Sequence, residues 1–92
     1  MGFKENLAQL TETEAIQSIT IYRKGELVRV IPNIPGKQGS VRVYANILGF
    51  EDGNITSGDA RRGLEIFDEL VDESRRNPGK HPNIDTLLEV VE

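Results

Sequence analysis

One stretch of sequence decides most of the fold: residues 59–76, which read DARRGLEIFDELVDESRR. On a period of 3.6 residues its apolar and small side chains gather on one side, and its charged side chains gather on the other. The apolar side consists of Ala60, Gly63, Leu64, Phe67, Leu70, Val71 and Ser74. This pattern predicts one long amphipathic helix over residues 59–76, whose apolar side the rest of the chain has to cover.

The ends of this predicted helix are marked by residues that favour them. Thr56 and Ser57 precede it and offer capping side chains. Arg75 and Arg76 end it, where positive charge complements the helix dipole. Gly63 lies on the apolar side and costs about 1 kcal/mol relative to alanine in a helix. Its presence predicts the close approach of another backbone, either within the chain or across a dimer seam.

A β-hairpin is predicted upstream of this helix. Residues 18–22 and 27–31 are rich in β-branched side chains, and a Lys-Gly pair at residues 24–25 supplies the turn. The second run is apolar on both faces, which indicates a strand that is covered on both sides or is not at an edge. Pro32 ends it, because proline cannot donate to a ladder. Residues 51–54, Glu-Asp-Gly-Asn, predict a further turn.

The segment at residues 41–48 is ambiguous. Its side chains alternate as a strand requires, yet Val41, Tyr44 and Ala45 also fit a helical stripe. Ser40 is a suitable cap and Gly49 a suitable stop, and they lie one helix length apart. We therefore expect a helix here and keep the strand as the alternative.

Two shorter helices are expected near the ends of the chain. Residues 3–10 have apolar side chains spaced four and three apart, which predicts a short helix with one apolar side. Asn83 is a suitable cap for a last helix. The side chains that share its apolar face are Ile84, Leu87, Leu88 and Val91. Together the elements predict a single α+β domain over residues 1–92: a small antiparallel hairpin sheet packed against three to four helices, with the long helix at its centre.

Composition narrows the classes of function. The 92 residues are 37% hydrophobic and 28% charged with a net charge of −4, and the densest basic pairs lie on the charged side of the long helix. Nucleic-acid binders normally carry a basic surplus or stripe, so we expect no nucleic-acid partner. There is no cysteine, which excludes a disulfide framework and a zinc site built on sulfur. No apolar run approaches the ~18 residues that span a bilayer, so we expect a cytoplasmic protein without a membrane partner.

Two loops resemble each other in sequence. Residues 35–40 read PGKQGS and residues 78–83 read PGKHPN, so each loop places a Pro-Gly turn and a lysine before a helix start. Free amides and the positive dipole end of a helix attract anions. If the loops meet, they predict a small-anion or nucleotide site. Its candidate residues are Lys37, Gly39, Ser40, Arg42, Lys80 and His81.

The strength of such a site is limited. Four exposed contacts at roughly 0.3–1 kcal/mol each correspond at best to about millimolar binding. The first loop is not a Walker A motif, because Ile31 stands where glycine is required and Gln38 where serine or threonine is required. The alternative is that both loops are plain turns, followed by caps at Ser40 and Asn83.

Neither catalysis nor a cofactor is predicted. His81 has Asp85 four residues on and is a candidate acid–base, but a lone histidine in a loop is more often structural. The carboxylates along residues 65–73 suit a hard cation by type, but a solvated helix face explains them better, because no histidine or loop carbonyl cage accompanies them. We therefore assign no catalytic residue, metal ligand or cofactor.

Three segments of the chain resemble a known family. They are FKENL at residues 3–7, PGKQGS at residues 35–40 with Val43-Tyr44 after it, and NPGKHPNID at residues 77–85 with Leu87-Leu88 after it. The chain resembles, over nearly its whole length, a family of small bacterial proteins catalogued only as a domain of unknown function. The resemblance implies a bacterial, intracellular, stand-alone domain, and it implies no activity, substrate or catalytic residue.

Two functions therefore remain open. The first is a non-enzymatic interaction or assembly domain, expected to be a homodimer or higher homo-oligomer, that binds through an exposed strand edge or helix stripe. The second is a weak small-anion or nucleotide-binding module at the two loops. A flat apolar surface favours the first function, and a pocket joining the loops favours the second.

Overall fold

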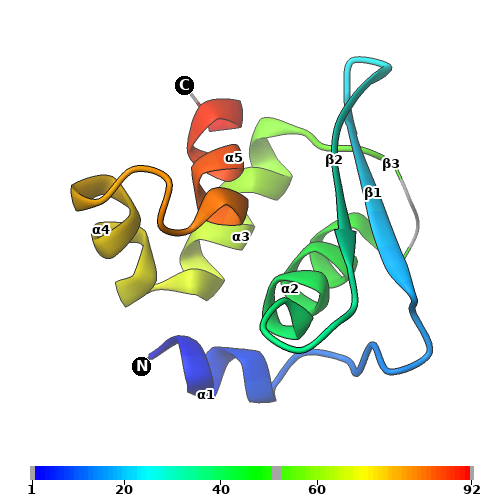
Figure 1. The fold of residues 1–92 in the computed structure, drawn as a ribbon, viewed down its shortest axis with the longest axis horizontal. Coiled ribbons are helices and arrows are strands. Elements are labelled where there is room, and N and C mark those ends of the chain that lie inside the picture. The colour runs from blue at the N-terminus through cyan, green and yellow to red at the C-terminus, as the bar shows by residue number, and fades with distance from the viewer. Residues whose placement is uncertain (1, 51–52, 92) are drawn as a thin grey trace.

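The computed structural model describes residues 2–50 and 53–91, and in that part of the chain it places five helices on one side of a three-stranded sheet (Figure 1). In chain order the elements are α1 (Phe3–Ala8), β1 (Ser18–Arg23), β2 (Glu26–Pro32), α2 (Gln38–Leu48), β3 (Gly53–Asn54), α3 (Ser57–Phe67), α4 (Glu69–Arg76) and α5 (Pro82–Val91). The predicted α+β class is confirmed.

The sheet has the order β2-β1-β3. Strands β1 and β2 form the predicted hairpin and pair antiparallel, whereas β3 pairs with β1 in parallel. Of the turn predicted at residues 51–54, Glu51 and Asp52 lie outside the described residues. Gly53 and Asn54 form β3 instead, because Asn54 Oδ1 accepts a hydrogen bond of 2.7 Å from the Gly25 amide and so ties β3 to the hairpin turn.

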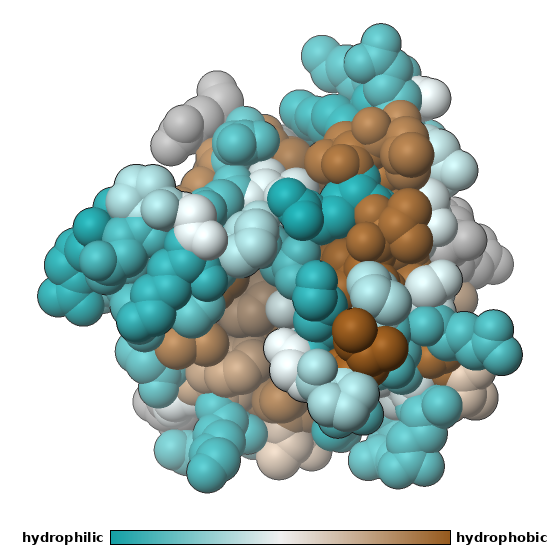
Figure 2. Space-filling view, viewed as in Figure 1, coloured by the Kyte–Doolittle hydropathy of each residue, from teal (hydrophilic) through white to brown (hydrophobic). Residues whose placement is uncertain are grey.

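Strand β2 was expected to be covered or internal, and this expectation is wrong. It is an edge strand, and the helices cover only one face of the sheet. Val28 has no partner in the β1–β2 register, so β2 carries a bulge there. Leu27, Val28 and Val30 are 61%, 39% and 52% exposed, and Figure 2 shows hydrophobic side chains gathered where β2 runs. Residues 27–31 are apolar on both faces because Ile31 points to the other face of the strand and reaches the core.

Helix α2 confirms the preferred reading of residues 41–48. It contacts the sheet on one side and helices α1 and α3 on the other. Its buried residues are Val41, Val43, Tyr44, Ala45 and Ile47. Burial on two sides explains why the sequence also alternates like a strand. The helix ends at Gly49, whose φ of 74° is left-handed, but it begins at Gln38 after Lys37, so Ser40 is not its cap.

The single long helix predicted over residues 59–76 is wrong. It is divided at Asp68, whose φ of 50° and ψ of −118° lie outside the helical region. Helix α3 ends before this residue and α4 begins after it, which turns the second half of the apolar stripe towards α5. The first half of the stretch keeps the predicted central place, because α3 packs against α1, α2, α4 and α5.

Of two local predictions about α3, the cap is confirmed and the close approach of another backbone is not. Thr56 caps it in a capping box with Asp59, in which each side chain accepts a backbone hydrogen bond of 3.1 Å from the other residue. A Cβ on Gly63 would lie 2.8 Å from Leu87 Cδ1 and 3.3 Å from Ile47 Cδ1. Gly63 therefore makes room for side chains of α5 and α2 within one chain, not for another backbone.

Helix α5 begins one residue earlier than its predicted cap. Pro82 occupies its first position, which suits proline because the first amides of a helix lack intrahelical partners. Asn83 lies inside the helix and is not its cap. Ile84 and Leu87 are buried, as the apolar spacing predicted, while Leu88 and Val91 are partly buried.

Candidate functional site

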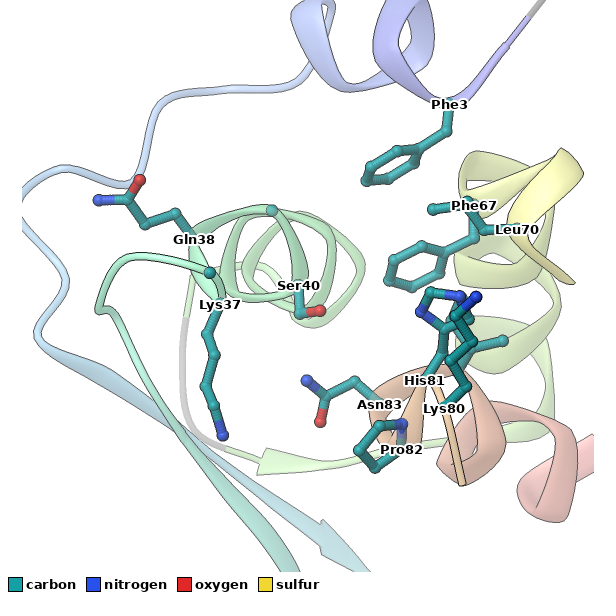
Figure 3. Close-up of a pocket in the computed structure, with 13 residues that line it drawn as sticks. Phe3, Lys37, Gln38, Ser40, Phe67, Leu70, Lys80, His81, Pro82 and Asn83 are labelled. Atoms are coloured by element: carbon teal, nitrogen blue, oxygen red, sulfur yellow. The ribbon is translucent and has the colours of Figure 1, made fainter. Parts of the chain in front are cut away.

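The two loops that resemble each other in sequence line one pocket. Residues 36–40 and residues 80–84 face each other across a pocket of about 450 Å³, together with three apolar side chains from α1, α3 and α4 (Figure 3). The two loops therefore meet in space, as the similarity of their sequences suggested. The loops contribute the first turns of α2 and α5 to the same space.

Both loops enter the pocket through the same type of backbone turn. Gly36 and Gly79 have φ values of 91° and 92°, a left-handed conformation that side chains rarely adopt. Each glycine lies in a turn closed by the lysine after it: Lys37 N–H donates to Ile34 O over 2.9 Å, and Lys80 N–H donates to Asn77 O over 3.1 Å. The Pro-Gly-Lys pattern is thus a turn that leads into a pocket wall.

One wall of the pocket is apolar. Phe3 of α1 stacks on Phe67 of α3, with ring centroids 5.2 Å apart and planes inclined by 17°. Leu70 of α4 continues this wall. The sequence did not predict these residues as pocket residues, because a continuous helix over residues 59–76 places Phe67 and Leu70 on one core stripe. The break at Asp68 is what brings Leu70 to the pocket.

The opposite wall is polar. In Figure 3 the Ser40 hydroxyl and the Asn83 carboxamide lie on this side of the pocket and point towards each other. Within residues 2–50 and 53–91 neither side chain has a hydrogen-bond partner. The backbone beneath is fixed, since Tyr44 Oη–H donates to Asn83 O over 2.6 Å. Burial raises the pKa of Tyr44, so its hydroxyl keeps the proton that this bond requires. The sequence assigned Asn83 only to a cap.

The basic side chains line the pocket without forming a clamp. Lys80 Nζ lies 2.5 Å from Glu73 Oε1, and this hydrogen bond and charge lower the pKa of Glu73. Lys37 lies across the pocket from Lys80, and its ammonium group points away from Ser40 (Figure 3). The expectation that Lys37 and Lys80 converge on one anion is therefore not met, although both residues belong to the pocket.

Arg42 does not belong to this pocket. Its guanidinium donates to Leu10 O over 2.6 Å and lies 3.8 Å from Glu12 Oε1, on the other side of α2. The structure therefore does not bring Arg42 together with the other candidate anion ligands. Spacing alone placed it two residues after Ser40, and two positions along a helix point away from each other.

His81 and Asp85 do not form an acid–base pair. Asp85 accepts hydrogen bonds from Ser74 Oγ at 2.6 Å and from the Gly79 amide at 2.9 Å, and these bonds lower its pKa. Asp85 thus fastens the second loop and α4 to α5. His81 Nε2 lies 3.5 Å from Glu73 Oε2, at the limit of hydrogen-bond distance, and faces Glu73 and not Asp85.

Helix α4 attaches to both walls of the pocket. Glu69 Oε1 accepts a hydrogen bond of 2.7 Å from the Phe3 amide, which fixes α1 and its ring. Glu73 holds Lys80 on the opposite side. The acidic face of α4 is therefore partly engaged. Among the described residues, no three His, Asp or Glu side chains are grouped to hold a metal ion.

The uncovered face of the sheet is a second candidate surface, and we call it the outer face. It consists of Thr20 and Tyr22 of β1, which are half-buried, and Leu27, Val28 and Val30 of β2. All five side chains are uncharged. It corresponds to the flat apolar surface that favours an interaction domain.

Comparison with known proteins yields one match. No curated protein and no solved structure matches the chain. In the described part of the chain, no helix has the length and apolar character to cross a membrane. A family model described as "Uncharacterized protein conserved in bacteria (DUF2322)" matches residues 3–92. Because this match covers nearly the whole chain, the chain belongs to this bacterial family.

Proposed function

We propose that the protein is a non-enzymatic interaction domain that forms a homodimer through the outer face of its sheet. The observation that supports this proposal is the exposure of Leu27, Val28 and Val30 on a face that no helix within residues 2–50 and 53–91 covers (Figures 1 and 2). Sheets in soluble proteins normally pack their apolar face against another layer. A second copy supplies that layer at the usual spacing of about 10 Å between sheets.

The face is a better contact than the strand edge. Pro32 has no N–H, and its carbonyl already accepts a hydrogen bond of 3.0 Å from the Ile34 amide. At the other end the bulge at Val28 interrupts the ladder. A bulge and a proline are devices that keep edge strands from pairing. Strand addition along β2 is therefore short at best, and side-chain packing on the outer face carries the association.

The chemistry of the outer face suits contact with a copy of itself. A twofold dimer brings each patch against the same patch, so charges on it repel. The side chains of the outer face are uncharged, although the chain carries a net charge of −4. Location in the cytoplasm remains a prediction of the sequence.

Light scattering after size exclusion tests the proposal. At ~100 μM, well above a typical specific dissociation constant, we expect a mass of about twice the 10.3 kDa of the chain. Val30→Lys, which places a charge at the centre of the outer face, should return the mass to that of one chain. Ala8→Lys is the matched control, because Ala8 is exposed on α1, away from the sheet. A wild-type mass of one chain, or a dimer that tolerates Val30→Lys, contradicts the proposal.

A further inference from the structure

The contrast between the two pocket walls restricts what can occupy the pocket. Phe3, Phe67 and Leu70 present carbon on one wall, while Ser40 and Asn83 present a hydroxyl and a carboxamide on the other (Figure 3). A volume of about 450 Å³ is within the range of small-molecule sites. A wholly polar ligand leaves the rings uncovered, and a wholly apolar ligand leaves two polar groups without partners.

The charge of the lining favours a negative ligand group. Among the described residues that line the pocket, Lys37, Lys80 and His81 are basic and none is acidic. Glu73 offsets Lys80 from outside the lining. Lys37 then leaves a local positive excess in a chain whose net charge is −4. A hydroxyl and a carboxamide also donate the hydrogen bonds that carboxylate oxygens accept.

We propose that this pocket binds a small monocarboxylate with an apolar or aromatic body. The carboxylate accepts hydrogen bonds from the Ser40 hydroxyl and the Asn83 carboxamide, and the body lies against Phe3, Phe67 and Leu70. Binding here differs from a lysine clamp around phosphate, because the ammonium groups of Lys37 and Lys80 do not converge. It is also independent of the outer face of the sheet, which uses other residues.

A series of four probes tests both halves of the ligand. Phenylacetate carries the charge and the ring, phenylacetamide lacks the charge, acetate lacks the ring, and inorganic phosphate is a charged anion without a body. Titration of the full chain, followed by two-dimensional amide NMR, should give phenylacetate a dissociation constant on the order of 1 mM. The other three probes should bind about tenfold more weakly, with the phenylacetate shifts centred on residues 36–40 and 80–84.

Each other outcome overturns the proposal. Acetate or phosphate binding as tightly as phenylacetate shows that the apolar wall contributes nothing. Phenylacetamide binding as tightly shows that the carboxylate contributes nothing. Phenylacetate shifts centred elsewhere, or none, show that the pocket is not the site.

A pair of variants locates the polar contacts. The double change Ser40→Ala and Asn83→Ala should weaken phenylacetate at least about fivefold, because it removes both hydrogen-bond donors. Ser57→Ala is the matched control on α3 and should leave the affinity unchanged. Equal affinity of the double variant and wild type contradicts the assignment. If the double variant does not fold, the wild-type probe series still decides the proposal.

Discussion

Phe67 is the position at which we expect the largest loss of stability from one truncation. Its side chain is 2% exposed and stacks on Phe3 at the end of α3. Replacing Phe67 by alanine leaves a cavity in a close-packed region, and such changes cost about 3–5 kcal/mol. A domain of this size is stable by roughly 5–14 kcal/mol, at 0.05–0.15 kcal/mol per residue. The variant should therefore lose from a fifth to all of its free energy of unfolding.

Urea unfolding followed by circular dichroism measures this loss. The measurement is made at two protein concentrations, because a dimer is more stable at the higher one. Phe50→Ala is the matched control, since Phe50 is 43% exposed and its truncation should change stability by less than about 0.5 kcal/mol. A Phe67→Ala variant within about 1 kcal/mol of wild type, or a Phe50→Ala variant that loses as much, refutes the orientation of α3.

Three further predictions follow from particular contacts. At equal ionic strength, phosphate should raise the melting temperature of wild type and of the double variant Lys37→Met, Lys80→Met by the same amount, because the two ammonium groups do not converge. A smaller response of the variant reveals a specific phosphate site. Asp85→Asn should flatten the loss of stability as pH falls from about 5 to 2, measured by urea midpoints. The hydrogen bonds that lower the pKa of Asp85 stabilise the fold above the unfolded pKa, and this contribution disappears in acid; parallel pH curves for wild type and variant contradict it. Asp68→Gly should raise the free energy of unfolding by about 0.5–2 kcal/mol in the same assay, because it relieves a positive φ at some cost in chain entropy; a destabilised variant shows that this conformation carries no strain.

The sequence predicted the type of most elements because their signals are local. The hairpin, the helix at residues 41–48 and the cap at Thr56 each depend on neighbouring residues, and all three are confirmed. The break at Asp68 could not be read, since its flanking residues keep a helical period across it. After the break α4 packs against α5, a contact between segments distant in the sequence that a local pattern does not report.

The sequence indicated which two loops line the candidate pocket but not which side chains enter it. The repeated Pro-Gly-Lys turns correctly suggested that two loops meet. Which side chains enter the space between them depends on tertiary contacts. Glu73 captures Lys80, Arg42 turns towards Leu10, and the division of the long helix brings Leu70 to the pocket.

The Lys80–Glu73 contact of α4 makes one side of the pocket sensitive to salt. The Lys80–Glu73 pair is partly exposed, and exposed ion pairs weaken as salt screens them. The Phe3–Phe67 wall depends on packing, which salt does not screen. Raising the ionic strength should therefore release the Lys80 side chain from Glu73, while the aromatic wall and the loop backbone held by Asp85 stay in place. The Lys80 side chain is then the part of the pocket opening whose position changes with salt, and the rings of Phe3 and Phe67 are the part that does not move.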